Sequence, residues 1–252
     1  MTPVEYIDGY YFKRDDKYEI CGVNGGKSRS AYQLIMQGVN LGFNTFVTAG
    51  SRMSPQCEIV SKICESLNLK CHLFMPKGKN TSVLNNIQNN KNSYIHQCKV
   101  GYNSVICHHA VEFAKLNNYF YIPFGMECSE NIEITKHQVL NIPENVKRII
   151  IPCGSGMSMI SVIKGLEHYN MTDKEVIGIQ VGKNPYKNLC KFGVKNNLFN
   201  IINFNIVKSE MDYHQQPKIT NFCGIELDPI YESKCIPFLQ KGDLLWIVGK
   251  RL

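Results

Sequence analysis

Short apolar runs that suit buried strands alternate with longer stretches that suit helices along almost the whole chain. Residues 44–50 (NTFVTAG), 70–76 (KCHLFMP) and 147–154 (KRIIIPCG) are rich in β-branched and other apolar side chains, which is typical of strands buried on both faces. Stretches with apolar residues at helical spacing follow the first and the last of them, at 54–69 and 158–169. Strand followed by helix, repeated, predicts parallel sheets covered by helices on both faces, an α/β fold.

The same pattern predicts further elements. Helices are expected at 104–118 and 130–142, and strands at 119–125, 175–182 and 243–249. The asparagine-rich segment 80–93 is predicted to be a helix with exposed polar faces, followed by a loop. A chain of 252 residues can bury a large core, and it has room for one domain or two closely coupled ones.

The composition is that of an ordinary globular protein, with 44% hydrophobic and 19% charged residues. No apolar run approaches the roughly 18 to 20 residues needed to cross a bilayer. Residues 1–16 carry acidic side chains early and have no apolar core, so they are not expected to be a secretory signal. We therefore expect a cytoplasmic protein, in the host cytoplasm if the chain is viral.

The chain has eleven cysteines, scattered through segments that are predicted to be helices and strands. This scatter favours reduced core residues over a disulfide framework. Cys57, Cys64 and Cys71 recur every seven residues, and Cys107 precedes His108 and His109, but no two CxxC pairs of matching spacing occur. Core packing is therefore the better interpretation, and no metal site is predicted.

The net charge of +7 comes from 28 basic and 21 acidic residues. Such a charge would suit an acidic or phosphorylated partner, but the lysines are spread out and form no dense stretch of basic and aromatic residues. A solvated surface is the simplest interpretation, and nucleic acid stays open as a partner.

The stretch CGVNGGKSRSA at 21–31 resembles part of a nucleotide-binding P-loop. Residues 26–28 (GKS) match the end of that motif, but its first glycine would fall on Cys21. The preceding residues 12–20 (FKRDDKYEI) are also too charged for a typical buried strand. We therefore reject the P-loop interpretation.

A second glycine-rich stretch is a better candidate for binding phosphate. In residues 148–166 a predicted buried strand is followed by GSGMS (154–158) and then by a predicted helix. Glycines allow backbone N–H groups to face a ligand, and the amino terminus of a helix adds about half a positive charge. Ser155 and Ser158 add hydroxyl donors. The alternative is a tight turn that only needs small residues.

Lys27 lies in a glycine-flanked turn before a predicted helix, away from that loop in the sequence. A lysine that reacts with an aldehyde needs little steric cover and a lowered pKa, which a neighbouring cation such as Arg29 and partial burial would promote. Considered by itself, Lys27 would more often be an ordinary surface lysine.

Four motifs in a fixed order resemble the fold type II pyridoxal-phosphate enzymes, the tryptophan synthase β-like group. The first is KRDD at 13–16 followed by GGK at 25–27. The others are TAGSRMSPQ at 48–56, GSGMS at 154–158 and LDPIYESK at 227–234. The most similar members are 1-aminocyclopropane-1-carboxylate deaminase and D-cysteine desulfhydrase. The resemblance extends from about Phe12 to Trp246, and it implies a two-lobed, three-layer αβα fold with mainly parallel sheets.

The resemblance also implies a role for each matching residue. Lys27 matches the lysine that forms the internal Schiff base with pyridoxal 5′-phosphate. Gly154, Ser155, Gly156, Met157 and Ser158 match the loop that holds the cofactor phosphate. In LDPIYESK, Glu232 matches the glutamate that faces the pyridine nitrogen, and Tyr231 matches a tyrosine that faces the substrate. A solvated acid beside Lys234 is the alternative for Glu232.

Three further residues, Ser54, Gln56 and Tyr213, are expected to contact the substrate. Ser54 matches a serine that binds the substrate carboxylate or helps to move a proton, and Tyr213 is aligned loosely with a second tyrosine. The asparagine that contacts the phenolic oxygen of the cofactor is replaced by Pro55, which has no donor. Gln56 or Arg52 are candidates to replace it, and Met157 stands where glycine is common.

The resemblance implies a pyridoxal-phosphate-dependent lyase or deaminase that acts on a small amino acid or amino-acid-like group. The chemistry would proceed through a Lys27 Schiff base and a carbanion at Cα, with the cofactor ring as electron sink. Two alternatives stay open. One is an enzyme of viral type acting on an amino-acid-modified nucleotide or on DNA, and the other is a non-catalytic protein that keeps the fold to bind a ligand.

The predicted lobes are a large cofactor-binding lobe (1–41 and 121–252) and a small inserted lobe (42–120). The cofactor is expected in a cleft between them, where such sites usually occur. The resemblance further implies a homodimer. The substrate and the bond that is broken are not specified by these motifs.

Overall fold

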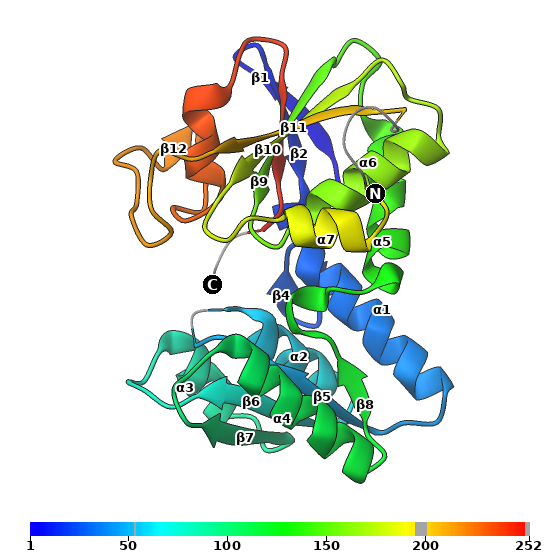
Figure 1. Cartoon of the computed structure of the whole chain (residues 1–252), viewed down its shortest axis with the longest axis vertical. Coiled ribbons are helices and arrows are strands. Elements are labelled where there is room, and N and C mark those ends of the chain that lie inside the picture. The colour runs from blue at the N-terminus through cyan, green and yellow to red at the C-terminus, as the bar shows by residue number, and fades with distance from the viewer. Residues whose placement is uncertain (53, 195–200, 250–252) are drawn as a thin grey trace. The chain divides into compact units, whose positions relative to one another are not determined.

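The computed structural model describes residues 1–52, 54–194 and 201–249, which belong to two units (Figure 1). Of the described residues, the discontinuous unit contains 1–18, 129–194 and 201–249, and the inserted unit contains those within 19–128. The inserted unit is larger than the predicted lobe 42–120, because residues 19–41, with Lys27, and residues 121–128 also belong to it.

The discontinuous unit is built on a six-stranded sheet in the order β1-β2-β14-β9-β10-β11. β1 pairs with β2 antiparallel, and all other neighbours in this sheet are parallel. The strands are β1 (Val4–Ile7), β2 (Tyr10–Arg14), β9 (Arg148–Cys153), β10 (Glu175–Gln180), β11 (Asn203–Lys208) and β14 (Leu244–Ile247).

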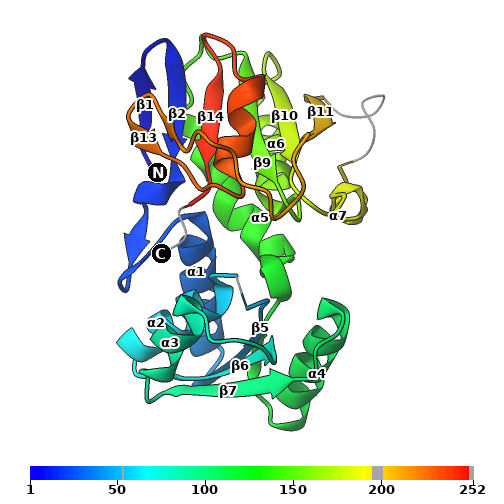
Figure 2. The same ribbon diagram turned by 90° about the vertical axis from the view of Figure 1, so that its left-hand side faces the viewer.

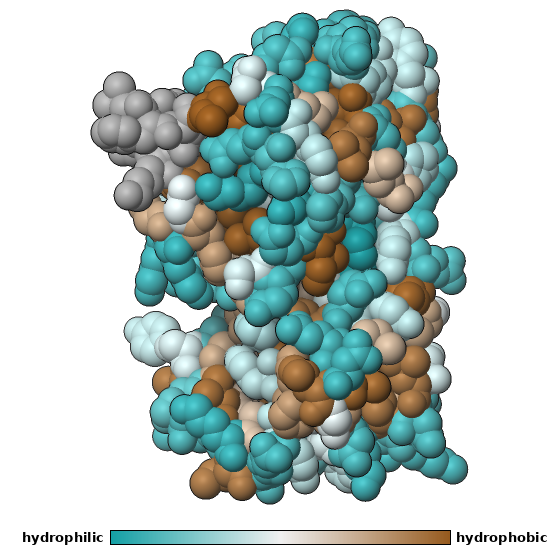
Figure 3. All heavy atoms as spheres, turned by 90° about the vertical axis from the view of Figure 1, so that its right-hand side faces the viewer, coloured by the Kyte–Doolittle hydropathy of each residue, from teal (hydrophilic) through white to brown (hydrophobic). Residues whose placement is uncertain are grey.

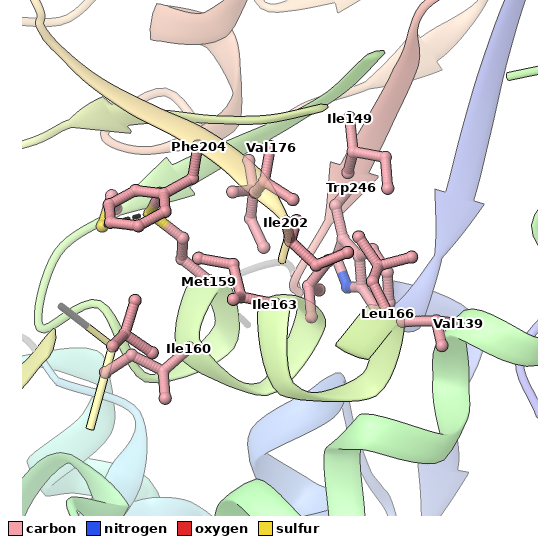
Figure 4. Packing of buried hydrophobic residues seen from close by; sticks show 14 of the residues in the cluster. Val139, Ile149, Met159, Ile160, Ile163, Leu166, Val176, Ile202, Phe204 and Trp246 are labelled. Atoms are coloured by element: carbon pink, nitrogen blue, oxygen red, sulfur yellow. Dashed lines mark hydrogen bonds between the residues drawn. The ribbon is translucent and has the colours of Figure 1, made fainter. Parts of the chain in front are cut away.

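Helices cover one face of this sheet. They are α5 (Ser129–Lys136), α6 (Met157–His168) and α7 (Tyr186–Lys191), with the short helix η3 (His137–Asn141) between the first two. Figure 4 shows Met159, Ile163 and Leu166 of α6 against strand residues that include Val176 and Trp246. These side chains are fully buried, so the face is held by apolar packing.

A different set of residues covers the opposite face. Alternate residues of the same strands, such as Ile150 and Leu245, pack with Ile225 and Cys235. These last two come from the small hairpin β12–β13 (Asn221–Phe222 and Ile225–Glu226) and from the short helix η4 (Glu232–Phe238). The strands are therefore buried on both faces, as the uniform apolar runs predict.

The charged segment 12–20 contributes to a buried strand, contrary to expectation. β2 lies between β1 and β14, and Lys13 in this strand is 0% exposed. The Lys13 ammonium donates to the Thr2 carbonyl at 2.8 Å and to Asn141 Oδ1 at 2.7 Å. A buried lysine is tolerated where its donors are used. The P-loop motif is still incomplete, because Cys21 stands where its first glycine is required.

The inserted unit contains a four-stranded sheet in the order β7-β6-β5-β8, and all its pairs are parallel. The strands are β5 (Thr45–Ala49), β6 (Lys70–Pro76), β7 (Ser93–Cys98) and β8 (Phe120–Ile122), and a small hairpin, β3–β4 (Glu19–Ile20 and Val23–Asn24), precedes them. The helices are α1 (Gly26–Asn40), α2 (Gln56–Ser66), α3 (Ser82–Gln88) and α4 (Asn103–Leu116). The first three pack on one face of the sheet and α4 packs on the other (Figure 2).

Most predicted elements are confirmed. β6 has the predicted bounds, and β5, β9, β10, α2, α4 and α6 lie within two or three residues of theirs. The helix expected at 130–142 is instead α5 followed by η3. The segment 80–93 contains helix α3, as expected, but β7 begins at its last residue and was not predicted.

The cysteines that recur every seven residues are core residues. Cys57, Cys64 and Cys71 are each 0% exposed, in α2 and β6. Burial raises the pKa of the Cys57 thiol to about 12, which keeps it protonated at neutral pH. The core-packing interpretation is therefore confirmed for these three.

The surface is mixed in character. On the face drawn in Figure 3, hydrophilic residues cover most of the surface and apolar residues are interspersed among them. Among the residues that the structure describes, no helix is long and apolar enough to cross a membrane.

Gly165 marks a close approach of α6 to the end of α5. A Cβ atom at this position would lie 2.3 Å from the Lys136 carbonyl oxygen and 3.0 Å from Val139 Cγ1. We expect Gly165→Ala to lower the free energy of unfolding by about 1–3 kcal/mol, although alanine is the better helix former. Denaturant unfolding followed by Trp246 fluorescence measures this change. Lys164→Ala, on the same helix, is the control, and an equal loss in both variants would contradict the steric explanation.

Candidate active site

The predicted phosphate loop connects β9 to α6 in the discontinuous unit. Gly156 has φ = 88°, in the left-handed region that glycine adopts without strain. A Cβ atom on Gly156 would lie 3.0 Å from Pro185 Cβ and 3.1 Å from Leu189 Cδ1. The loop ends at the first turn of α6, where backbone N–H groups have no partner within the helix. This geometry suits an anion.

Side chains from later in the chain hold the loop in place. Asn188 Nδ2 donates to the Ser155 carbonyl at 2.9 Å. A Cβ atom on Gly154 would lie 3.1 Å from Tyr231 Cε1, so the ring of this tyrosine packs directly on the loop. Ser155 and Ser158 are both half-buried, which leaves their hydroxyl groups partly accessible to a ligand.

The segment LDPIYESK has a defined local structure. Asp228 Oδ1 accepts hydrogen bonds from the backbone N–H groups of Ile230 at 2.8 Å and Tyr231 at 3.0 Å. The Asp228 carbonyl accepts from the N–H of Ser233. An aspartate that binds the amides just after it is a common turn device. It orients Tyr231 and Glu232 at the start of η4.

Tyr231 and Tyr213 lie together. Their hydroxyl oxygens are 3.2 Å apart, and their rings meet edge to face with centroids 6.2 Å apart. Lys234 fixes the Tyr213 loop, since its ammonium donates to the carbonyls of Asp212 at 2.7 Å and Tyr213 at 3.0 Å. The structure thus brings the loosely aligned Tyr213 beside the residues predicted from LDPIYESK.

Glu232 is a buried carboxyl group with one oxygen unused. The residue is 0% exposed, and its Oε1 accepts from the Val248 N–H at 2.9 Å. Its Oε2 is buried and has no hydrogen-bond partner within the described part of the chain. Burial, and then the nearby charge of Asp228, raise the pKa of Glu232 to about 8, although backbone N–H groups oppose this rise.

A buried carboxyl oxygen without a hydrogen-bond partner requires an explanation. A ligand that brings a ring N–H to Glu232 would supply that donor and would favour the charged carboxylate. The phosphate loop, Tyr231 and Glu232 all belong to the same unit, so this unit offers groups for both ends of such a ligand. Pyridoxal phosphate has both an anionic phosphate and a ring nitrogen, and these residues fit it.

Lys27 is the second residue of α1 in the inserted unit, and its side chain is exposed. The preceding Gly25 has φ = 93°, which glycine adopts readily. Ser28 anchors the turn, since its hydroxyl donates to the Asn24 carbonyl at 2.6 Å and its N–H donates to the Gly25 carbonyl at 3.0 Å. The backbone around Lys27 is therefore fixed by its neighbours.

Ser54 lies in the loop between β5 and α2. Its backbone N–H donates to the Ser51 carbonyl at 3.0 Å, and its hydroxyl accepts a long hydrogen bond of 3.4 Å from the Gln56 N–H. Pro55 has φ = −69° and directly precedes α2, a position where proline is compatible with a helix. The structure thus shows a local reason for proline at this position.

Gln56 is buried and its amide is already bonded within the inserted unit. Its Nε2 donates to Thr48 Oγ1 at 2.8 Å and to the Pro123 carbonyl at 2.9 Å. Its Oε1 accepts from the Gly125 N–H at 2.7 Å. Both donor hydrogens are used, so Gln56 ties the start of α2 to the loop after β8. Gln56 thus has a structural role within this unit, and its contact with substrate stays a prediction.

Arg52 packs against the loop that follows β6. Its Nη1 donates to the Pro76 carbonyl at 2.9 Å, and its own carbonyl accepts from Thr81 Oγ1 at 3.3 Å. Its Nη2 is buried without a hydrogen-bond partner in the ranges that the structure describes. Arg52 therefore joins the Ser54 loop to the neighbouring loop of the same sheet edge.

Some residues that position the candidate site side chains and loops were not predicted from the sequence. Asn188 and Lys234 position the phosphate loop and Tyr213 through bonds to backbone carbonyls, and no local motif marks such long-range contacts. Asp228 could have been found, because Asp-Pro is a turn signal. Within the described ranges, no group of three His, Cys, Asp or Glu side chains could hold a metal ion.

Comparison with known proteins supports the fold and gives one relative by sequence. No protein-family model matches the chain. It is 25% identical over 201 residues to an O-seryl-dTMP PLP-dependent decarboxylase of Salmonella phage ViI, a match that covers 69% of this chain. The chain spans about half the length of this curated relative, since the match covers 47% of it.

Solved structures match almost the whole chain. An ACC deaminase homologue aligns with a TM-score of 0.79 and 20% identity, covering 98% of this chain and 89% of the other. Threonine deaminase isoform 2 from Solanum lycopersicum aligns with a TM-score of 0.68 and 14% identity, covering 100% and 79%. A pyridoxal 5′-phosphate-dependent aspartate racemase aligns with a TM-score of 0.59 and 13% identity, covering 98% and 74%.

These alignments confirm the predicted fold. The chain has the α/β fold of the fold type II pyridoxal-phosphate enzymes, with mainly parallel sheets. The roles of individual residues are not tested by a likeness at this level of identity, and they stay predictions.

Proposed function

We propose that this protein is a pyridoxal-phosphate-dependent lyase or deaminase that acts on a small amino acid or amino-acid-like group. The observation that carries the proposal is the buried, unpartnered Oε2 of Glu232 in the same unit as a glycine loop suited to phosphate. The fold and the motif order support the same conclusion. The cofactor would supply an electron sink for the bond that breaks at Cα.

The residues of the chain have separate tasks in this proposal. Gly154–Ser158 would bind the cofactor phosphate, and Glu232 would accept from the ring nitrogen and keep that nitrogen protonated. Lys27 would bond the cofactor aldehyde and, once released by a substrate amine, would move a proton at Cα. Ser54 would bind the substrate carboxylate, and the paired Tyr231 and Tyr213 would contact the substrate.

A more specific substrate class is favoured by the phage relative. That protein is named for a decarboxylase reaction on a seryl group carried by a thymidine nucleotide. We propose as second candidate that this chain acts on an amino-acid-modified nucleotide. For a decarboxylation, the bond between Cα and the carboxyl group breaks, CO₂ leaves, and Lys27 delivers a proton to Cα.

Spectroscopy of purified protein tests the cofactor and its lysine together. We expect added pyridoxal phosphate to give the absorbance band of a cofactor–lysine imine, and borohydride to fix a pyridoxyl group on Lys27 in peptide mapping. Free amino acids and an O-seryl nucleotide can then be compared for spectral change and CO₂ release. Failure to load would favour the non-catalytic alternative. Gel filtration with light scattering tests the homodimer that the resemblance implies.

A further inference from the structure

Acidic residues are absent from a long part of the inserted unit. Between Glu65 and Glu112 the sequence contains no aspartate or glutamate. The same part contains five lysines, all of which are exposed: Lys70, Lys77, Lys79, Lys91 and Lys99. It forms β6, α3, β7 and the first half of α4. The charge of this part of the unit is therefore uniformly positive.

Three of these lysines lie at one edge of the sheet. β6 ends at Pro76 and β7 ends at Cys98, and these two residues are paired in register. β6 and β7 lie side by side (Figure 2). The Lys77 N–H donates to the Cys98 carbonyl at 2.8 Å, so Lys77 and Lys99 follow these neighbouring strands at their carboxyl ends. Lys79 follows two residues later. None of the three forms an ion pair with a described acidic residue.

The proposed substrate-binding loop lies at the same edge. β5 is parallel to β6 and next to it, so the Ser54 loop also follows the carboxyl end of a strand. Arg52 contacts the next loop, and a Cβ atom on Gly78 would lie 3.0 Å from Arg52 Nε. In open α/β sheets, ligands bind at this end of the strands.

The same edge carries an exposed aromatic residue. Tyr102 is 83% exposed and directly precedes α4. The first turn of α4 contains no acidic residue, so the positive end of the helix dipole is not neutralised there. Positive charge next to an exposed aromatic ring is the combination that binds a nucleic-acid strand, through its phosphates and by base stacking.

We propose that this edge is a DNA-docking surface, formed by Lys77, Lys79, Lys99 and Tyr102. Phosphates of the strand bind the three lysines, and an unpaired base stacks on Tyr102. The surface presents an amino-acid-modified nucleotide to the Ser54 loop while that nucleotide is still part of the polymer. The inference rests on the modified-nucleotide form of the proposed function, and it specifies DNA rather than a free nucleotide.

The test uses the whole chain loaded with pyridoxal phosphate and a fluorescein-labelled single-stranded DNA of mixed sequence. In the edge variant, Lys77, Lys79 and Lys99 are each replaced by glutamine. In the control variant, Lys70, Lys91 and Lys115 are replaced by glutamine. These three lie at the opposite edge, near the starts of β6 and β7 and at the end of α4. Both variants lose the same charge.

We expect the edge variant to bind DNA about 10- to 100-fold more weakly at roughly 0.1 M salt than the wild type. The slope of log affinity against log salt should fall by about 2, since each phosphate contact on a single strand contributes about 0.7. The control variant should keep most of the affinity. Tyr102→Ala should weaken single-strand binding about tenfold with little change in the salt slope.

Several outcomes would overturn the inference: equal loss in both triple variants, tighter binding to RNA than to DNA, or no binding by the wild type at low salt. The proposed function is judged separately, by pyridoxyl labelling of Lys27. Labelled protein that does not bind DNA contradicts only the docking surface, whereas DNA binding without labelling contradicts the enzyme. Far-ultraviolet circular dichroism checks that each variant is folded. The single variants Lys79→Gln and Lys70→Gln repeat the comparison of DNA affinity between the two edges.

Discussion

A Lys27→Ala variant should lose the absorbance band of the cofactor–lysine imine and nearly all turnover. Proton transfer by a positioned side chain contributes about 10²–10⁴-fold, and this variant also loses the covalent attachment. We therefore expect a decrease in turnover of at least about 10³-fold. The readouts are the absorbance spectrum, pyridoxyl labelling after borohydride, and product formation.

Lys187→Ala is a matched control for this variant. Lys187 is also an exposed lysine at the second position of a helix, in α7. We expect Lys187→Ala to keep the band and the labelling. Lys27→Arg tests whether charge alone suffices, because arginine keeps the positive charge but does not form the imine. A retained imine band in Lys27→Ala would show that another lysine carries the cofactor.

The second large effect is expected from Glu232→Gln. Glutamine has nearly the same shape, but it cannot stabilise a positive charge at the ring nitrogen. Removal of one preorganised electrostatic contact of this kind typically costs about 10²–10³-fold in turnover. We expect a decrease in that range with the cofactor still bound, as measured by turnover and by pyridoxyl content. Unchanged turnover would contradict the ring contact.

Glu232 also makes a prediction about stability and pH that does not depend on activity. Its pKa in the folded protein is raised to about 8 from the ordinary 4.5. Between these pH values the folded protein holds a proton that the unfolded chain has released. The contribution of Glu232 to the free energy of unfolding therefore falls as pH rises from about 4.5 to about 8, and it levels off above.

Denaturant unfolding without cofactor, between pH 5 and 9, measures this effect. Glu232→Gln should be more stable than the wild type at the alkaline end and should show less pH dependence. Saturation with pyridoxal phosphate should flatten the wild-type profile too, because a ring N–H favours the charged carboxylate. Identical profiles with and without cofactor would argue against the contact.

The sequence predicts the fold well where strands are uniformly apolar. β6 and β9 are recognisable because both faces of each strand pack against apolar side chains. β7 escaped prediction because it is an edge strand without a fully buried residue, and its sequence includes the polar His96 and Gln97. β2 contains Lys13, whose buried ammonium donates to Thr2 and to Asn141, and Asn141 lies 128 residues away in the sequence.

The sequence predicts only those parts of the candidate site that depend on local motifs. Glycine loops and the turn at Asp228 are local, so short motifs reveal them. The use of the Gln56 amide by Thr48 and Gly125 depends on how the sheet folds, and no pattern around residue 56 indicates it. The proximity of Tyr213 to Tyr231 likewise arises from tertiary structure, through Lys234.

The pairing of β2 with β14 has a consequence for synthesis on the ribosome. The register joins Phe12 to Leu245, so β2 lacks its partner β14 in the sheet until residues 244–247 have emerged. The inserted unit is continuous in sequence, and its four strands lie between residues 45 and 122. Domains generally fold as units during translation, amino-terminal part first. The inserted unit can thus complete its sheet before β14 has been synthesised, at a stage when β2 of the other unit is not yet paired with it.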